Sequence, residues 1–339
     1  MQLQQRINAF KNLGHYLGEL ASENHPDFEQ LTLAKAHNRW FTIPYIQFAL
    51  LQWEAALSEE NLTKWCHSYS FPEKEPKAVA VVMAGNIPLV GFHDFISVLI
   101  SGNSVLAKGS SNDKILLPFI AKKLVEIEPS FLDRITFSEG KLESFDAVIA
   151  TGSNNTSLHF EYYFGKYPHI IRKNRNSVAV LTGNETPQQL ELLAEDIFSY
   201  FGLGCRNVSK LYLPEGYHFD AFFNAMFSQK EVINHDKYMN NYDYNKAVYL
   251  MSNIPLLDNE FLLLKEDAGF SSPIAVVFYE YYQSLERVKK HLGENAEHLQ
   301  CIVSALGMKN EVAFGQTQSP ALWEYADGVD TMEFLLNLA

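Results

Sequence analysis

Cysteine is scarce in this sequence. The 339 residues include three cysteines, Cys66, Cys205 and Cys301, which lie far apart along the chain. No CxxC pair occurs, and no cysteines and histidines stand at the spacing of metal ligands. This pattern excludes a disulfide scaffold and argues against a zinc site. We therefore expect no metal and a reducing compartment, the cytoplasm.

Positive charge and long apolar runs are also scarce. Lysine and arginine total 27 against 40 acidic residues, which gives a net charge of −13. This balance argues against a broad nucleic-acid surface, although it leaves room for a local patch that binds a phosphorylated cofactor. Polar residues, among them Asn86, His93 and Asp94, interrupt the most apolar stretch, residues 78–107. It never reaches the roughly 20 clean residues of a membrane span. The polar N-terminus also lacks the apolar core of a signal peptide.

Two common nucleotide-binding motifs are missing. No GxGxxG follows an apolar strand-like segment, and no glycine-rich loop ends in Gly-Lys followed by Ser or Thr. The sequence therefore lacks the usual dinucleotide fingerprint and the phosphate loop of nucleoside triphosphatases.

Apolar segments rich in β-branched residues alternate with helical patterns from residue 78 onward. This alternation predicts a doubly wound α/β fold with a parallel sheet, and the length favours two lobes. We expect a helical N-terminal region over 1–75, a first α/β domain over 76–183 and a second over 184–310. A tail over 311–339 is expected to return to the first domain. The polar, tyrosine-rich residues 232–246 are interpreted as an exposed connection.

Cys205 lies in the segment "FGLGCRNVSKLYLP", between a helical pattern and an apolar strand-like run. Gly202 and Gly204 permit backbone angles that other residues resist, so a tight turn can hold the thiol. Backbone N–H groups near the sulfur could then stabilise an oxyanion on a bound carbonyl. The alternative is an inert packed thiol beside a helix-capping glycine. We interpret Cys66 and Cys301 as packed thiols of this second kind.

Asn86 follows the first apolar run, in "AGNIPLVG". Its side-chain amide could donate to a developing oxyanion. Taken alone, however, an asparagine shortly before Pro88 is more typical of an ordinary turn residue.

Four segments in order resemble the aldehyde dehydrogenase superfamily: "MAGNIPLVG", "ISGNSVLAKGSS", "AVIATGS" and "FGLGCRNVSKLYLP". Within it the chain is most similar to the acyl-CoA reductases, a family that includes the fatty-acid reductases of bacterial bioluminescence. The resemblance implies an aldehyde-dehydrogenase-like fold, with a cofactor domain followed by a catalytic domain. It also implies that Cys205 is the nucleophile and that Asn86 donates to the oxyanion.

The same resemblance implies a set of cofactor contacts. Lys108 matches the lysine that reaches the adenosine ribose, and Glu266 matches the acid at the nicotinamide ribose. The neighbouring Asp267 is an alternative to Glu266 for this match, and a solvated acidic turn is the other interpretation of the segment. The full expected set is Ala84, Gly85, Lys108, Ser110, Ser111, Gly152, Ser153 and Glu266.

Two departures from the superfamily pattern narrow the expected reaction. Hydrolytic members carry a glutamate that activates water, whereas the matching stretch here, residues 170–181, contains no carboxylate. This absence favours reduction of an acyl thioester over oxidation of an aldehyde to an acid. Many NAD-specific members place a glutamate where this chain has Ser111. Without that charge a 2′-phosphate meets no repulsion and Lys108 can attract it, so we expect NADPH more than NADH.

The expected activity is reduction of an acyl-CoA to an aldehyde through an acyl thioester on Cys205, with coenzyme A as the leaving group. One alternative is a coenzyme-A-acylating aldehyde dehydrogenase that runs in the oxidative direction. Another acyl donor, either an acyl phosphate or a protein-bound thioester, is also open. A non-catalytic subunit that carries an acyl group or acts as a scaffold is the alternative from a different class. The resemblance further suggests a homodimer and a possible acyl-transfer partner protein.

Overall fold

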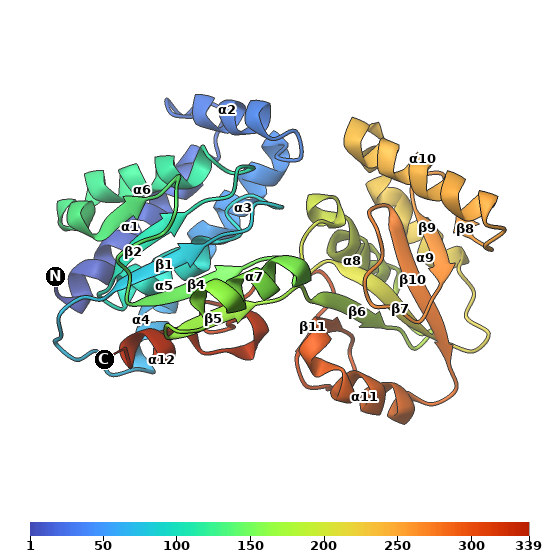
Figure 1. The fold of residues 1–339 in the computed structure, drawn as a ribbon. Helices are drawn as coiled ribbons and strands as arrows, with labels where there is room; N and C mark the ends of the chain where they lie inside the picture. The colour runs from blue at the N-terminus through green and yellow to red at the C-terminus, as the bar shows by residue number, and fades with distance from the viewer. Residues whose placement is uncertain (339) are drawn as a thin grey trace. The chain divides into compact units, whose positions relative to one another are not determined.

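The structure, a computed structural model, describes residues 1–338 and contains two compact units (Figure 1). Unit 1 comprises Met1–Asn174 together with the C-terminal segment that starts at Ala321, and unit 2 comprises Arg175–Pro320. Each unit is built around its own largely parallel β-sheet. The predicted α/β class is therefore confirmed.

Unit 1 contains a five-stranded sheet in the order β3-β2-β1-β4-β5. All of its strand pairs are parallel. The chain runs outward from β1 to β3 and then returns to place β4 on the other side of β1. The strand order therefore reverses between β1 and β4, as in doubly wound folds. The strands are β1 (Ala78–Val82), β2 (Ser104–Lys108), β3 (Ile135–Phe137), β4 (Ala147–Thr151) and β5 (His169–Arg172).

Helices cover both faces of this sheet. In β1, Val79 and Val81 point into the larger hydrophobic cluster, whereas Ala80 belongs to a smaller cluster that includes Phe160 and Phe164 of α7. The N-terminal helices share the larger cluster with α5 and α6. The helices are α1 (Leu3–Leu20), α2 (Glu29–His37), α3 (Ile43–Ala56), α4 (Glu59–His67), α5 (Phe92–Ile100), α6 (Leu116–Ile127) and α7 (Asn154–Phe164), with the 3-10 turn η1 (Pro129–Arg134).

The C-terminal segment completes the core of unit 1. It contains the short turn η5 (Ala326–Gly328) and the helix α12 (Thr331–Leu336). Trp65 Nε1 donates to the Tyr325 hydroxyl at 2.6 Å, and Met332 lies fully buried in the larger cluster. The tail therefore packs directly against helix α4.

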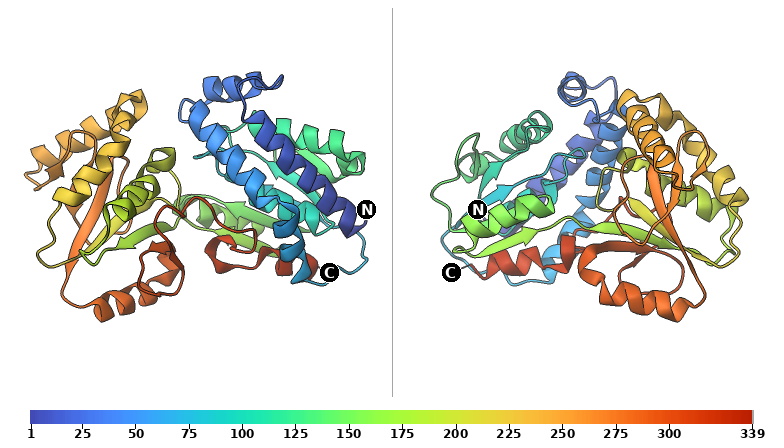
Figure 2. Two further views of the ribbon diagram at one scale, coloured as in Figure 1. Left: turned by 180° about the vertical axis from the view of Figure 1, so that it is seen from behind. Right: turned by 45° about the vertical axis from the view of Figure 1, so that its right-hand side comes forward.

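Unit 2 contains a seven-stranded sheet in the order β12-β11-β6-β7-β10-β9-β8. Every pair is parallel except β8 with β9. Helices α8, α9 and α10 lie on one side of the sheet and α11 lies on the other (Figures 1 and 2). The strands are β6 (Asn176–Val180), β7 (Val208–Pro214), β8 (Leu257–Asp258), β9 (Leu263–Glu266), β10 (Val276–Tyr282), β11 (Leu299–Val303) and β12 (Glu311–Val312).

The helices of unit 2 are joined by short 3-10 turns. The helices are α8 (Pro187–Phe198), α9 (Asp220–Met226), α10 (Asp236–Met251) and α11 (Leu285–Glu294), and the turns are η2 (Ser199–Gly202), η3 (Phe227–Asn234) and η4 (Ala296–His298). Over residues 1–338, no helix has the length and hydropathy that crossing a membrane requires.

The unit boundary lies earlier than we predicted. We expected the first domain to run to residue 183, but β6 pairs with β7 and β11 inside the sheet of unit 2. The local sequence pattern of a strand does not indicate which sheet the strand joins, because its partner strands can lie far away in the sequence. For the same reason the expected tail is divided, since residues up to Pro320 belong to unit 2 and only those from Ala321 onward belong to unit 1.

Residues 232–246, expected to be an exposed connection, fold mainly into α10. The helix buries Tyr238, Tyr242 and Asn245, which stand four and three residues apart on one face. Tyr238 donates its hydroxyl hydrogen to the Phe261 carbonyl oxygen at 2.9 Å. The prediction failed because the buried face of this helix consists of tyrosine and asparagine rather than aliphatic residues.

Replacing Tyr325 by Phe tests how much the tail contributes to unit 1. The substitution leaves the buried Trp65 N–H without its acceptor, which should lower the free energy of unfolding by about 1–3 kcal/mol. Urea denaturation followed by fluorescence measures the loss. Tyr281→Phe, at an exposed site, is the matched control, and equal midpoints for the two variants would contradict this role of the tail.

Candidate active site

Cys205 lies on an exposed turn between η2 and β7, whereas Cys66 and Cys301 are buried. Burial raises the pKa of the Cys66 thiol to about 12, so this thiol stays protonated and unreactive at neutral pH. Cys205 is thus the accessible cysteine of the three, and Cys66 and Cys301 are packed thiols as predicted.

The backbone before Cys205 is strained. Tyr200, Phe201 and Gly202 have φ values of 52°, 60° and 74°, all in the left-handed region. Each of the two non-glycine residues costs about 1–3 kcal/mol in this conformation, so the surroundings must hold it in place. We expected Gly202 and Gly204 to supply unusual angles. Gly202 does so, but Gly204 has no positive φ, and the buried aromatic residues take its place.

The side chain of Asn207 holds this turn. Its Nδ2 donates to the carbonyl oxygens of Asp196 at 3.2 Å and Ser199 at 2.8 Å, at the end of α8. Its Oδ1 accepts from the Gly204 N–H at 2.8 Å. One buried amide therefore satisfies the otherwise unpaired carbonyls at the helix end and fixes the backbone next to Cys205.

A second anchor joins the turn to the segment that follows β12. Arg206 Nε donates to the Thr317 carbonyl oxygen. The Asp196 carboxylate accepts from the N–H groups of Gly315 at 2.7 Å and Thr317 at 3.1 Å. Burial raises the pKa of Asp196 to about 6, although both backbone hydrogen bonds oppose the shift. The role of Asp196 was not predicted from the sequence, although an acidic residue next to the apolar residues of α8 was a usable signal.

A third contact supports the turn from the start of β6. Ser177 Oγ donates to the Cys205 carbonyl oxygen at 2.9 Å and lies 2.9 Å from Cys301 Sγ. Cys301 Sγ in turn lies 3.9 Å from the Arg206 carbonyl oxygen. Side chains from β6 and β11 therefore contact the backbone of Cys205 and Arg206, and the Asn207 side chain connects the same turn to the end of α8.

In unit 1, the expected cofactor residues gather at one edge of the sheet. They follow three strands that lie side by side in the order β2-β1-β4, so the carboxyl ends of these strands meet. This edge includes the point where the strand order reverses, which is where open α/β sheets bind ligands. The residues are Ala84, Gly85 and Asn86 after β1, Lys108, Ser110 and Ser111 at the end of β2, and Gly152 and Ser153 after β4.

Close packing at this edge accounts for Gly85. A Cβ atom on Gly85 would lie 2.5 Å from Ser110 Cβ, so only glycine fits between the two turns. Lys108 Nζ donates to the Gly140 carbonyl oxygen at 2.9 Å. Ser153 caps α7, because its Oγ accepts from the Thr156 N–H at 3.3 Å.

The loop after β2 is held by contacts that the sequence did not reveal. His37 Nε2 lies 2.8 Å from the Ser111 carbonyl oxygen, so the N-terminal helices reach this loop. Asp113 accepts from the Leu89 N–H at 3.4 Å and the Leu116 N–H at 3.3 Å. Burial raises the pKa of Asp113 to about 6. Asp113 thereby connects the loop after β2 to the turn that carries Asn86.

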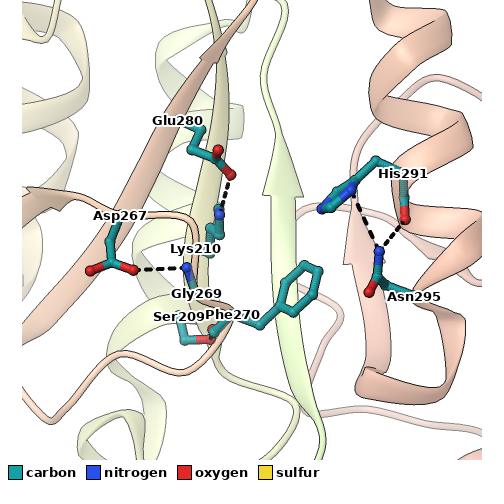
Figure 3. A network of polar contacts seen from close by, with 8 residues as sticks. All are labelled: Ser209, Lys210, Asp267, Gly269, Phe270, Glu280, His291 and Asn295. Atoms are coloured by element: carbon teal, nitrogen blue, oxygen red, sulfur yellow. Dashed lines mark hydrogen bonds and ion pairs between the residues drawn. The ribbon is translucent and has the colours of Figure 1, made fainter.

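In unit 2, Glu266 and Asp267 have different surroundings. Asp267 forms an ion pair with Lys265. It also accepts from the Gly269 N–H at 2.8 Å (Figure 3). Lys265 is the main reason why the pKa of Asp267 lies below its usual range. Glu266 is exposed, and its side chain makes no hydrogen bond or ion pair with another residue in 1–338. Of the two acids, Glu266 is the one left available to a ligand.

Figure 3 shows how the segment after Glu266 is fixed to β7. Ser209 Oγ donates to the Phe270 carbonyl oxygen at 2.7 Å. Lys210 is fully buried and forms an ion pair with Glu280. Burial lowers the pKa of Lys210, and Glu280 opposes this shift only in part. Glu266 of β9 and Leu211 of β7 both pair with Tyr279 of β10, which lies between the two strands. Glu266 therefore lies two strands away from β7, the strand that follows Cys205.

The family model "Acyl-CoA reductase (LuxC)" matches residues 51–221, half of the chain. The chain belongs to the acyl-CoA reductase (LuxC) family. The matched residues include the turn of Asn86, Lys108 and the turn of Cys205, which are the segments on which the resemblance was based. Family membership makes the protein an oxidoreductase of the acyl-CoA reductase type. No curated protein matches the sequence.

Solved structures agree on the fold. Aldehyde dehydrogenase 21 from Physcomitrella patens, in complex with succinate, has a TM-score of 0.72 at 13% identity and covers 99% of this chain and 84% of its own. An oxidoreductase from Marinobacter aquaeolei has a TM-score of 0.68 at 11% identity, with coverage of 100% and 85%. An NAD⁺ complex of an aldehyde dehydrogenase from Bacillus cereus has a TM-score of 0.62 at 13% identity, and the match covers 89% of this chain and 72% of that enzyme. The predicted aldehyde-dehydrogenase-like fold is confirmed.

The raised pKa of Asp196 predicts a pH-dependent stability. The pKa of Asp196 is about 6 in the folded protein and 3.8 in the unfolded chain, so the folded state holds the proton more tightly. The stabilisation from this proton is complete below pH 3.8 and is lost as the pH rises through 6. Asp196→Asn removes this titrating group. The free energy of unfolding should therefore fall less between pH 4.5 and 7.5 in the variant than in the native protein, and the difference should be about 3 kcal/mol at most. Urea midpoints at the two pH values measure the difference. Parallel pH profiles for the variant and the native protein would contradict the assignment.

Proposed function

We propose that this protein uses NADPH to reduce an acyl-CoA thioester to an aldehyde, through an acyl thioester on Cys205. The observation that carries the proposal is the exposed Cys205 on a strained turn, which three separate side-chain anchors hold in a member of the acyl-CoA reductase family. Strained backbone held by its surroundings is typical of catalytic residues.

The proposed covalent chemistry uses the thiol of Cys205. The Cys205 thiolate attacks the acyl carbonyl carbon, the carbon–sulfur bond to coenzyme A breaks, and the acyl group remains on Cys205 as a thioester. The charge that develops on the carbonyl oxygen is stabilised by the backbone N–H of Cys205. We assign the Asn86 side-chain amide the same task, because its motif matches that of the family's oxyanion donor. After reduction of the acyl carbon, the thiohemiacetal collapses to release the aldehyde and the Cys205 thiol.

The edge of the unit 1 sheet fits a nicotinamide dinucleotide. It lies where the strand order reverses, and the turn at Gly85 allows close backbone approach. Bound NADPH supplies the hydride for the reduction. We propose that Lys108 and Ser111 bind the phosphorylated adenosine ribose, and that Gly152 and Ser153 line the same site. Glu266 is proposed to bind the nicotinamide ribose, since its carboxylate has no partner within residues 1–338.

The absence of a hydrolytic base supports reduction over hydrolysis. The stretch where hydrolytic relatives carry their glutamate corresponds to residues 170–181, which include no acidic residue. Without a positioned base, water is a poor nucleophile toward the acyl thioester. The acyl group can therefore persist on Cys205 until it is reduced.

Cys205→Ser tests the proposed nucleophile. A serine hydroxyl without a nearby base is far less nucleophilic than a thiolate, so acyl-CoA-dependent NADPH oxidation should fall by about 1,000-fold or more. Absorbance of NADPH at steady state measures the rate. Cys66→Ala is the control for loss of a cysteine elsewhere and should retain nearly native activity in folded protein. Native activity in Cys205→Ser would contradict the proposal.

Ser111→Glu tests the proposed preference for NADPH. A carboxylate at this position would repel the 2′-phosphate and bind the ribose hydroxyls of NADH, so kcat/KM for NADPH relative to NADH should fall about 10-fold or more. Steady-state rates with each cofactor at one acyl-CoA concentration give the ratio. Ser130→Glu, at an exposed site in η1, is the control and should leave the ratio unchanged. An unchanged ratio in Ser111→Glu would show that Ser111 does not discriminate between the cofactors.

A further inference from the structure

The turn that carries Asn86 is strained at Leu89. Leu89 has a φ of 58°, in the left-handed region, and directly follows Pro88. Glycine is the usual residue where φ is positive after a proline, and a leucine there persists only when its surroundings hold it. Leu89 is buried in the core of unit 1. Contacts from outside the turn must therefore keep its backbone in this conformation.

The side chain of Asp113 supplies such a contact. Its Oδ2 accepts from the Leu89 N–H at 3.4 Å, and its Oδ1 accepts from the Leu116 N–H at 3.3 Å, at the start of α6. The two oxygens therefore have separate tasks, since one holds the strained turn and the other caps a helix. A buried N–H without an acceptor is costly, so the conformation at Leu89 depends on the carboxylate.

Asp113 is itself fixed by the loop that follows β2. Its N–H donates to the Ser110 carbonyl oxygen at 3.1 Å, and the Asn112 N–H donates to Ser110 Oγ at 3.2 Å. From outside the loop, the buried Asn38 donates through Nδ2 to the Asn112 carbonyl oxygen at 3.3 Å. The carboxylate therefore extends from a backbone that is held both within the loop and by the N-terminal helices.

Asn86 stands between two residues that this loop fixes. On one side, Gly85 packs so closely on Ser110 that a Cβ atom on the glycine would lie 2.5 Å from Ser110 Cβ. On the other side, three residues after Asn86, Asp113 holds Leu89. One loop therefore sets the backbone both before and after Asn86.

We propose that Asp113 is a positioning residue for Asn86: its carboxylate fixes the turn from which the Asn86 amide donates to the oxyanion of the acyl carbonyl. This inference rests on the proposed function, and it places no contact between Asp113 and the substrate. Without the bond to the Leu89 N–H, the strained turn relaxes and carries the Asn86 amide away from its place. A hydrogen-bond donor stabilises developing charge only when it is already aimed at the oxygen, so a small displacement is costly to the rate.

Asp113→Asn separates the two tasks of the carboxylate. Asparagine caps helices as well as aspartate does, but its amide nitrogen cannot accept from the Leu89 N–H. We expect the rate of acyl loading onto Cys205, without NADPH, to fall more than 10-fold, whereas the Kd for NADPH stays within twofold of native. Quenched-flow mass spectrometry gives the rate, with whichever of acetyl-, octanoyl- and dodecanoyl-CoA loads the native protein fastest. Fluorescence titration gives the Kd. Asp113→Ser, which also keeps one capping oxygen, is the second variant and should show the same loss.

A double-mutant cycle with Asn86→Ala shows whether Asp113 acts through Asn86. We expect Asn86→Ala to slow loading more than 10-fold, and Asp113→Asn to add less than a further twofold on that background. Asp330→Asn is the matched control, because Asp330 also caps a helix, α12, and accepts a second hydrogen bond from the Tyr69 hydroxyl. This control should load the acyl group within twofold of the native rate.

Native loading by Asp113→Asn, or losses that multiply in the double variant, would overturn the inference and leave the proposed function standing. A native protein that loads none of the three acyl groups would overturn both. Hydrogen exchange provides a readout of the turn itself. Peptides that cover residues 84–91 should exchange at least 10-fold faster in Asp113→Asn than in the native protein or in Asp330→Asn. Unchanged exchange would also overturn the inference, because the carboxylate would then not hold the turn.

Discussion

The side-chain amide of Asn207 is the contact on which the nucleophile turn depends. It pairs with carbonyl oxygens at the end of α8 and with the N–H of Gly204, so one buried group closes the helix and fixes the residue before Cys205. A helix end leaves carbonyls unpaired, and burying them without partners is costly. The chain can therefore leave α8, pass through two left-handed non-glycine residues and enter β7 within ten residues.

The remaining anchors act on the same short segment from different elements. Asp196 on α8 binds the backbone of residues 315–317, and Thr317 in turn receives the Arg206 guanidinium. Ser177 on β6 donates to the carbonyl of Cys205 itself. These supports come from helix, sheet and loop, and they add to the contact that Asn207 makes. A reactive group on a strained turn requires such support from its surroundings.

The sequence predicted the fold class and the family, but it did not predict the sheet that β6 joins or the buried helix α10. Short buried β-branched runs separated by helical patterns were enough for the α/β class, and the order of four motifs was enough for the family. The sheet to which β6 belongs could not be predicted from its local pattern, because Val178 and Val180 are typical of a buried strand in either sheet. Helix α10 was missed because tyrosines form its buried face. Arg206 stands beside Cys205 in the sequence, but its partner Thr317 lies 111 residues away, and only the fold brings the two together. The partners of Asn207 lie at most 11 residues away, but the contacts depend on how the chain turns at the end of α8.

The most direct test of the central claim is intact-protein and peptide mass spectrometry after mixing the native protein with a panel of acyl-CoAs and no NADPH. The predicted result is one acyl group per chain, located on the peptide that contains Cys205. The adduct should persist until NADPH is added, because no acidic residue in 170–181 is available to activate water. Reduction of acyl-CoA with no adduct, or with the acyl group on another residue, would contradict the account.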